Sequence, residues 1–299
     1  MMNNSFNDIL DSYAELINGR LDEYKNYYMS KADKGQGIIA EAMWYSLSAG
    51  GKRIRPVLVL EFCRMCGGDI SSALSSACAV EMIHTFSLIH DDMPCMDDDD
   101  YRRGQPSCHK RFGEAMALLA GDALLNHAYE IICNDGSLTA ETKIKIIARL
   151  SHATGINGMT GGQVLDIEQD SSEFSLDKLT EMYKLKTGAL LAVSCVTGCL
   201  VGGGSEKQIK AASEYAEKMG LAFQIIDDIL DIEGTDTELG KPVGSDERHN
   251  KKTYASAAGT EKAAQKARQL TNEALAMLSE FDNSNFIKEL TRRLLSRKK

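Results

Sequence analysis

Residues 77–100 read ACAVEMIHTFSLIHDDMPCMDDDD, and this stretch decides how the rest of the chain is interpreted. Its first half, Ala77 to Ile89, is apolar at helical spacing and too long for a single strand. Its second half holds six carboxylates within ten residues and no basic side chain. Neighbouring like charges repel one another and are costly to bury without cations. We therefore expect a buried helix that ends at the mouth of a cavity.

Helical periodicity extends through most of the remaining sequence. Apolar residues of 6–17 follow the i, i+3, i+4, i+7 pattern, and 57–66 is apolar at the same spacing. Glycine clusters interrupt the pattern at 50–51, 67–68, 161–162 and 202–204. No convincing set of alternating strands, linker or internal repeat is present. The sequence predicts an all-α fold and one domain over residues 1–299.

Composition excludes several classes of protein. The 299 residues carry a formal net charge of −9, which argues against a general nucleic-acid binder. The N-terminal 30 residues are polar and acidic, unlike a secretory signal, and eight scattered cysteines suit free thiols in a reducing cytoplasm. The longest apolar stretch, Gly188 to Gly204, is shorter than the roughly 20 residues a bilayer requires. We expect it to be a buried core helix and not a membrane span.

A second acidic cluster, Asp227-Asp228-Ile-Leu-Asp231, lies inside an apolar run. The spacing places Asp227 and Asp231 on one helical face, a turn apart. Hard oxygen ligands of this kind suit Mg²⁺, which bridges to phosphate oxygens. Each cluster alone is compatible with either a metal site or a solvated surface. Two of them, each joined to an apolar helix, favour a metal-filled cavity between helices.

Basic residues alternate with these carboxylates. The segment Gly50-Gly51-Lys52-Arg53-Ile54-Arg55-Pro56 opens an apolar run, and Lys52 and Arg55 one turn apart at a helix start could cradle a phosphate. Further cations follow each acidic cluster or precede the core helix, at Arg102-Arg103, Lys186 and Lys241. This alternation fits a diphosphate that is bound partly through metal and partly through Lys and Arg.

In their order, these motifs resemble those of the trans-type polyprenyl diphosphate synthases, most closely the bacterial farnesyl diphosphate synthases. The resemblance runs from Gly50 to Lys251, most of the chain. Its motifs are GGKRIRP at 50–56, the segment 84–104, GDAL at 121–124, GGQ at 161–163, KTG at 186–188, FQIIDDILD at 223–231 and LGK at 239–241. The implied fold is an antiparallel helical bundle around a central cavity, of the isoprenoid synthase type. The implied assembly is a homodimer.

The resemblance also implies a role for individual residues. Mg²⁺ would be held by Asp91 and Asp97 on one wall and by Asp227 and Asp231 opposite. The allylic diphosphate would be contacted by Arg102, Lys186 and Lys241, with Lys251 or its neighbour Lys252 also at the diphosphate. Lys186, Thr187 and Gln224 would be catalytic, the last two beside the developing carbocation. Isopentenyl diphosphate would be bound by Lys52, Arg55, His84 and Arg103.

The implied reaction needs no dedicated nucleophile. The allylic C–O bond ionises, the double bond of isopentenyl diphosphate attacks the cation, and the released diphosphate takes the proton. Dimethylallyl and geranyl diphosphates would be the allylic substrates, and trans,trans-farnesyl diphosphate the product. Phe86 lies five residues before Asp91, about 7–8 Å deeper along the helix, with the small Ser87 beside it. The family associates such a ring with stopping at a fifteen-carbon product; Phe86 could instead simply pack in the core.

Other functions fit the residues less well. A geranylgeranyl diphosphate synthase shares the chemistry and is the nearest alternative, followed by a non-catalytic prenyltransferase subunit, which is expected to have lost aspartates or cations. Terpene cyclases mix Asn, Ser and Glu in the second metal motif, and the segment at 227–231 does not. A di-iron bundle needs two E-x-x-H motifs, and only Glu81 to His84 supplies one. The first acidic cluster lacks the central glycine and terminal Glu of an EF-hand.

Overall fold

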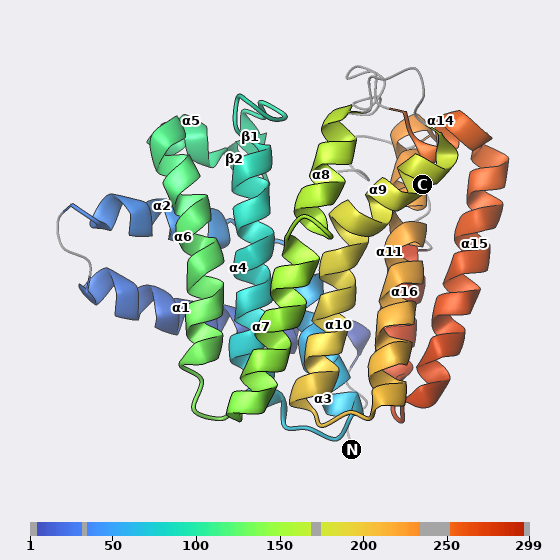
Figure 1. Cartoon of the computed structure of the whole chain (residues 1–299), viewed down its shortest axis with the longest axis horizontal. Helices are drawn as coiled ribbons and strands as arrows, with labels where there is room; N and C mark the ends of the chain where they lie inside the picture. The colour runs from blue at the N-terminus through green and yellow to red at the C-terminus, as the bar shows by residue number, and fades with distance from the viewer. Residues whose placement is uncertain (1–4, 32–34, 169–174, 234–251, 296–299) are drawn as a thin grey trace. The chain divides into compact units, whose positions relative to one another are not determined.

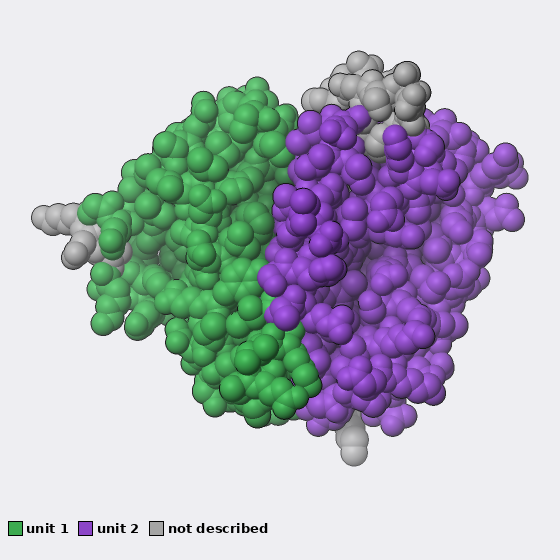
Figure 2. Space-filling model, in the orientation of Figure 1, with its two compact units in different colours: residues 1–60, 69–147 green, residues 61–68, 148–299 purple. Residues whose placement is uncertain are grey.

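The structure, a computed structural model, describes residues 5–31, 35–168, 175–233 and 252–295 (Figure 1). These residues are almost entirely helical, which confirms the all-α prediction. The chain divides into two compact units, coloured separately in Figure 2. Unit 1 is Met1–Leu60 with Asp69–Ile147, and unit 2 is Glu61–Gly68 with Ala148–Lys299. A single domain over residues 1–299 stays a prediction.

Unit 1 is built around one buried helix. Its elements are α1 (Phe6–Lys31), α2 (Gly37–Leu47), the start of α3 (Ile54–Met65), the 3₁₀ helix η1 (Ile70–Ala73), α4 (Leu74–Asp91), α5 (Cys108–Phe112), α6 (Glu114–Cys133) and the start of α7 (Ala140–Thr154). Helix α4 packs on α6, α1 and α2, and most of its residues are buried. Its apolar sequence, which fits burial on all sides, therefore positions Asp91 at its C-terminal end.

A short hairpin follows α4 within unit 1. Strand β1 (Tyr101–Arg102) pairs antiparallel with β2 (Gln105–Pro106), with Tyr101 opposite Pro106. Arg103, with φ of 54°, and Gly104, with φ of 76°, make the turn. The hairpin carries Arg102 back to the acidic segment that precedes it, where it pairs with Asp92 and Asp99.

Unit 2 is organised around α11. Its elements are the ends of α3 and α7, then α8 (Met159–Ile167), α9 (Leu176–Tyr183), the π-helical turn η3 (Lys184–Gly188), α10 (Ala189–Val201), α11 (Glu206–Glu233), α14 (Tyr254–Ala258), α15 (Thr260–Met277), the 3₁₀ helix η4 (Leu278–Glu280) and α16 (Asn285–Leu295). Helix α11 packs on α10, α15 and α16. The hydroxyl of Tyr215 on α11 is fully buried and shares a 2.7 Å hydrogen bond with Thr291 on α16.

The expected glycine breaks are confirmed at 50–51, 67–68 and 202–204, which lie between helices. The break expected at 161–162 is wrong, because both residues lie inside α8. A Cβ at Gly162 would collide with the backbone of Lys186 in η3. Glycine is needed there for close approach of two backbones and not to end a helix.

Among the residues that the structure describes, two helical stretches, Ile70–Asp91 and Leu176–Val201, are long and apolar enough to cross a membrane by length and composition alone. The second is longer than the apolar run read from the sequence because α9, η3 and α10 are continuous. The buried share of the apolar window is 78% in the first and 56% in the second. Core helices pass the same test, so these stretches are weak evidence for a membrane protein.

Candidate active site

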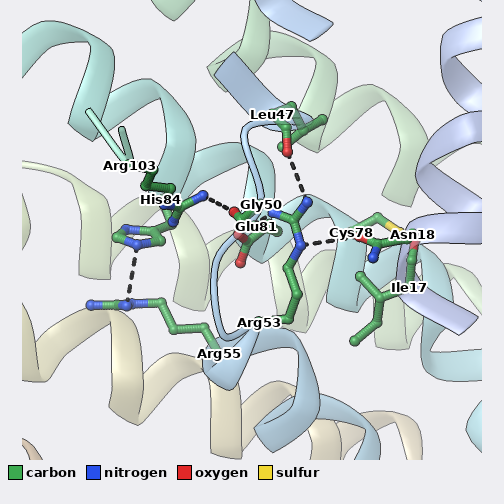
Figure 3. Close-up of polar contacts among 10 residues, drawn as sticks. All are labelled: Ile17, Asn18, Leu47, Gly50, Arg53, Arg55, Cys78, Glu81, His84 and Arg103. Carbon is green, nitrogen blue, oxygen red and sulfur yellow. Dashed lines mark hydrogen bonds and ion pairs between the residues drawn. The ribbon is translucent and has the colours of Figure 1, made fainter. Parts of the chain in front are cut away.

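The loop between α2 and α3 brings Arg103 against the glycine pair. Gly50 and Gly51 have φ of 87° and 118°, in a region that L side chains rarely adopt. A Cβ on Gly51 would stand 2.6 Å from the guanidinium carbon of Arg103. That guanidinium donates through Nη1 to the carbonyl oxygen of Gly50 (Figure 3). Both glycines are thus required for the loop to receive Arg103.

Lys52 and Arg55 do not occupy one helical turn as expected. Helix α3 begins at Ile54, and Arg53 before it has a φ of 48°. Lys52 is exposed in the loop, whereas Arg55 lies in the first turn of the helix and is half-buried. The two cations thus come from a loop and from a helix, and not from one helical face.

Arg55 and His84 form the centre of a cationic group (Figure 3). Nη1 of Arg55 lies 3.4 Å from Nε2 of His84, which α4 supplies. Burial lowers the pKa of Arg55 to about 10, and the Arg103 charge acts in the same direction. Burial and the surrounding arginines, Arg55 first, hold the pKa of His84 well below its usual value. His84 is therefore neutral near pH 7 and available as a hydrogen-bond partner.

This cationic group keeps an unused donor. Nε of Arg55 is buried and, among the residues that the structure describes, has no hydrogen-bond partner. Unsatisfied buried donors are costly, so they call for an acceptor. Arg55, His84 and Arg103 together present donors and positive charge, which suits a diphosphate. Lys52 stands in the adjoining loop.

Arg102 is held by the carboxylates of the first acidic cluster. Its Nε donates to Oδ1 of Asp92 at 2.9 Å, and its Nη2 donates to the same oxygen and to Oδ2 of Asp99, the latter at 2.9 Å. Burial raises the pKa of Asp92, an effect that the Arg102 hydrogen bond opposes. Burial acts to lower the pKa of Arg102, but the hydrogen bond to Asp92 and the charges of Asp92, Asp99 and Asp91 together outweigh it, so the pKa is raised. Asp92 thus orients Arg102 from within the protein.

The two predicted metal ligands of this cluster are half-buried and brought together by the chain turn after α4. The backbone N–H of Asp97 donates to the carbonyl oxygen of Asp91 at 2.9 Å. Asp98, with a φ of 53°, then turns the chain toward the hairpin. Although six positions apart in the sequence, Asp91 and Asp97 are therefore neighbours through their backbones.

A different group of potential ligands lies next to this turn. Ligand atoms of Asp98, Asp100 and His109 are within 4.8 Å of one another. Nδ1 of His109 lies 3.1 Å from the Ser107 hydroxyl, and Lys110 pairs with Asp100 at 2.6 Å. The ammonium group already compensates one of the carboxylates, so we assign no ion to these residues.

Lys186 lies in unit 2, in the π-helical turn η3. Its Nζ is 2.6 Å from Oδ2 of Asp166 on α8, and the Asp166 side chain is nearly buried. Single π-helical turns inside helices are frequent at functional sites. The turn and Asp166 together fix the direction of the Lys186 side chain.

Thr187 follows in the same turn and donates through Oγ1 to Oε1 of Gln224 on α11 at 3.1 Å. Both side chains are half-buried. The structure thus brings together the two residues expected beside the carbocation, although 37 positions separate them.

The second acidic cluster is divided by the geometry of α11. Asp228 is buried, and its Oδ2 accepts from the Tyr183 hydroxyl at 2.8 Å and from the Tyr254 N–H at 2.7 Å. Asp227 is half-buried, and Asp231 one turn later is buried. The carboxylate between them therefore serves the protein core, and Asp227 and Asp231 stay the predicted metal ligands.

Of the remaining predicted residues, the structure describes Phe86 and Ser87 but not Lys241 and Lys251. Phe86 is half-buried on α4, and its ring meets that of His90 edge to face at 5.7 Å. Ser87 beside it donates to the carbonyl oxygen of His84 at 2.9 Å. Lys241 and Lys251 lie outside the described residues.

Sequence reasoning missed two carboxylates that hold the basic residues. Glu81 pairs with Arg53 at 2.6 Å, and Asp166 pairs with Lys186. Glu81 carried a usable signal, because a carboxylate in the middle of a very apolar helix needs a cation partner. Asp166 follows a short apolar run in the same way, but nothing local pointed to Lys186, 20 residues further on.

Comparison with known proteins defines the class to which this fold and site belong. A geranyltransferase from Legionella pneumophila superimposes with a TM-score of 0.86 at 32% identity, covering 98% of both chains. The fold is that of the isoprenyl diphosphate synthases. Residues 36–294 match the family model described as Polyprenyl synthetase. The chain belongs to this family and is a prenyltransferase of isoprenoid synthesis.

Relatives with different products are similarly close. A farnesyl diphosphate synthase from Geobacillus stearothermophilus is 49% identical over 223 residues, 74% of this chain and 75% of its own length. A geranylgeranyl diphosphate synthase from Cyanophora paradoxa is 46% identical over 248 residues, 82% of this chain and 83% of its own length. Overall similarity therefore does not choose between a farnesyl and a geranylgeranyl product.

Proposed function

We propose that this protein condenses isopentenyl diphosphate with dimethylallyl and geranyl diphosphates and releases trans,trans-farnesyl diphosphate. The observation that carries the proposal is the cationic group of Arg55, His84 and Arg103. In this group the buried Nε of Arg55 has no hydrogen-bond acceptor among the described residues. A diphosphate supplies several such acceptors at once. The 49% identity to a farnesyl diphosphate synthase supports the same substrate class.

The carboxylates fit Mg²⁺ as the cofactor. Asp91 and Asp97 are close in unit 1, and Asp227 and Asp231 stand one turn apart in unit 2. Carboxylate oxygens that leave room for water and phosphate oxygens are the ligands that Mg²⁺ prefers. When bound, the ion neutralises charge on the departing diphosphate. These four residues are the ones we propose as its ligands.

The side chains of this protein bind and orient the substrates. Arg102, Lys186 and Lys241 contact the allylic diphosphate, while Lys52, Arg55, His84 and Arg103 bind isopentenyl diphosphate; Lys251 completes the set of diphosphate contacts. Holding two substrates in register converts a bimolecular step into an effectively unimolecular one. The Thr187 hydroxyl and the Gln224 carbonyl oxygen place partial negative charge beside the allylic cation. The proton that leaves at the end goes to the released diphosphate.

Product analysis tests this function. Purified protein is incubated with isopentenyl and dimethylallyl diphosphates, with and without Mg²⁺, and the products are sized by chromatography. We expect a fifteen-carbon product that forms only with the divalent ion. Absence of condensation under every metal condition would favour a non-catalytic subunit.

A geranylgeranyl diphosphate synthase is the second candidate, and the 46% identity to such an enzyme favours it. The two candidates differ in cavity depth below the first acidic cluster. We assign the floor to the Phe86 ring, whose edge-to-face contact with His90 fixes its orientation. A twenty-carbon main product from the same assay would establish the second candidate.

We also propose a homodimer in the cytoplasm, with no nucleic-acid partner. Gel filtration with light scattering measures the assembly directly, and a mass of one chain, 32.7 kDa, would exclude the dimer. Cell fractionation checks the location: the protein is expected with the cytoplasmic fraction and not with membranes.

A further inference from the structure

Arg53 stands among the predicted diphosphate-binding cations, yet it is buried and turned to other partners. It is 5% exposed, and its φ of 48° is left-handed, which is uncommon for a residue with a side chain. Nη1 donates to Oε1 of Glu81 at 2.6 Å and Nη2 to the carbonyl oxygen of Leu47 at 2.8 Å. Nε donates to Oδ1 of Asn18 at 3.1 Å. Every nitrogen of the guanidinium is thus engaged inside the protein (Figure 3).

These contacts explain the backbone conformation. A left-handed residue that is not glycine costs about 1–3 kcal/mol and persists only where its surroundings fix it. Three elements fix Arg53: α1 through Asn18, the end of α2 through Leu47, and α4 through Glu81. The chain reverses at Arg53, so Lys52 before it and Arg55 after it take their directions from this anchor.

Glu81 is the carboxylate that accompanies this group of cations. It is 2% exposed on α4, one turn before His84. The Glu81 charge also acts to raise the pKa of the Arg55 and Arg103 guanidinium groups, against burial and the charges of neighbouring arginines. Glu81 thus offsets positive charge at the place where Arg55, His84 and Arg103 meet. Figure 3 shows it between Arg53 and the His84 side of the group.

We propose that Glu81 and Arg53 are positioning residues for the binding of isopentenyl diphosphate. Neither touches the substrate. Their buried ion pair holds the left-handed turn that aims Lys52 and Arg55, and the Glu81 carboxylate keeps the cationic group assembled before the diphosphate arrives. The inference rests on the proposed function, because it assigns these two residues to the isopentenyl diphosphate half of that site.

The chain offers a matched control in unit 2. Glu61 is 1% exposed and pairs with Arg64, with Nε to Oε1 at 3.0 Å and Nη2 to Oε2 at 2.8 Å. At both places a buried glutamate pairs with an arginine, so removing the glutamate charge is destabilising, although the Arg64 side chain is more exposed than that of Arg53. Among the contacts of the described residues, Glu81 pairs with Arg53 and acts on the charges of Arg55 and Arg103, whereas Glu61 pairs with Arg64. Glu61→Gln therefore reports the purely structural effect of neutralising a buried glutamate.

The test compares Glu81→Gln, Arg53→Lys and Glu61→Gln with the wild type by steady-state kinetics and thermal unfolding. We expect Glu81→Gln to raise the KM for isopentenyl diphosphate about tenfold or more while the KM for the allylic substrate stays within about twofold. Arg53→Lys, which keeps the charge, should raise the first KM less. Glu61→Gln should lower the melting temperature comparably and leave both KM values unchanged. An unchanged KM for isopentenyl diphosphate in folded Glu81→Gln, or an equal rise in Glu61→Gln, overturns the proposal.

A binding measurement keeps this test separate from the proposed function. Isopentenyl diphosphate is titrated by calorimetry into each protein without an allylic substrate. Wild type that binds but does not condense contradicts the proposed function and leaves the positioning role to be decided by the variants' Kd. If Glu81→Gln does not fold, Arg53→Lys carries the comparison: a weaker Kd than in wild type supports the inference, and an unchanged Kd overturns it.

Discussion

Lys186 and Asp166 form a short, largely buried ion pair, with 2.6 Å between Nζ and Oδ2, and the lysine sits in a π-helical turn. The pair holds in place an ammonium group that we assign to the allylic diphosphate. Removing Asp166 leaves that charge without its partner and its side chain without a fixed direction.

Asp166→Asn is therefore expected to raise the KM for the allylic substrate about tenfold, with a smaller effect on the KM for isopentenyl diphosphate. Initial-rate kinetics with each substrate varied in turn measure both. Asp177→Asn, an exposed change on α9, is the control and should leave both constants as they are. Equal changes in the two KM values would contradict a specific role of Asp166 in binding the allylic substrate.

The predicted metal ligands can be tested one from each unit. Asp91→Ala and Asp227→Ala are each expected to lower kcat by about a hundredfold or more, since charge on the leaving diphosphate would no longer be compensated. Circular dichroism should show the helical content of wild type. Asp11→Ala, exposed on α1, serves as the control. Wild-type turnover in either variant would contradict the metal assignment.

Asp228 gives a prediction about stability and not about turnover. Tyr183→Phe deletes a hydrogen bond to a buried carboxylate and is expected to reduce the free energy of unfolding by about 1–3 kcal/mol. Urea unfolding followed by circular dichroism measures the change. Mg²⁺ dependence of the activity should stay as in wild type, because Asp227 and Asp231 keep their positions. A shifted Mg²⁺ dependence would show that Asp228 contributes to the metal site.

The chain-length assignment predicts that Phe86→Ala lengthens the product by at least one isoprene unit, because the ring that forms the cavity floor is removed. Products are sized after reaction with excess isopentenyl diphosphate. Phe112→Ala removes another half-buried ring in unit 1, which meets the Tyr45 ring edge to face with 5.4 Å between ring centroids, and should leave product length as it is. Unchanged products from Phe86→Ala would return Phe86 to an ordinary core role.

Cys66 gives a pH-dependent prediction. The thiol of Cys199 hydrogen-bonds that of Cys66 and lowers its pKa, whereas burial acts to raise it. Cys199→Ala removes the donor, so the pKa of Cys66 should rise and its thiolate should appear only at higher pH. Alkylation rates at Cys66, followed by peptide mass spectrometry across pH, measure the shift. An unchanged pH midpoint would contradict the role of Cys199.

The regular helices and the acidic motifs could be predicted from sequence because their signals are local. Apolar periodicity predicted α4 and α10, and the i, i+4 spacing separated Asp227 and Asp231 from Asp228. The start of α3 could not be predicted in this way. Arg53 leaves the helical conformation because Asn18, 35 residues earlier, and Glu81, 28 residues later, hold its guanidinium. Contacts between residues so far apart in the sequence do not show in the local spacing of apolar and polar residues.

The same limit applies to the partners of the site. The Asp228 carboxylate accepts a hydrogen bond from the backbone N–H of Tyr254, which follows a stretch outside the described residues. Position 162 inside α8 needs a glycine because the backbone of Lys186 lies close to it. Both facts depend on how helices meet. Sequence reasoning supplied the residues that we propose to carry the chemistry, while the contacts that hold them came from the structure.

Adjacent residues of the hairpin engage opposite partners: Arg102 binds Asp92 and Asp99, whereas Arg103 reaches the Gly50 carbonyl. One peptide bond thus separates guanidinium groups that serve different diphosphates in our proposal. Inserting or deleting a single amino acid between 99 and 104 would exchange their orientations and misdirect both at once. Natural variation in this segment should therefore consist of substitutions at constant length.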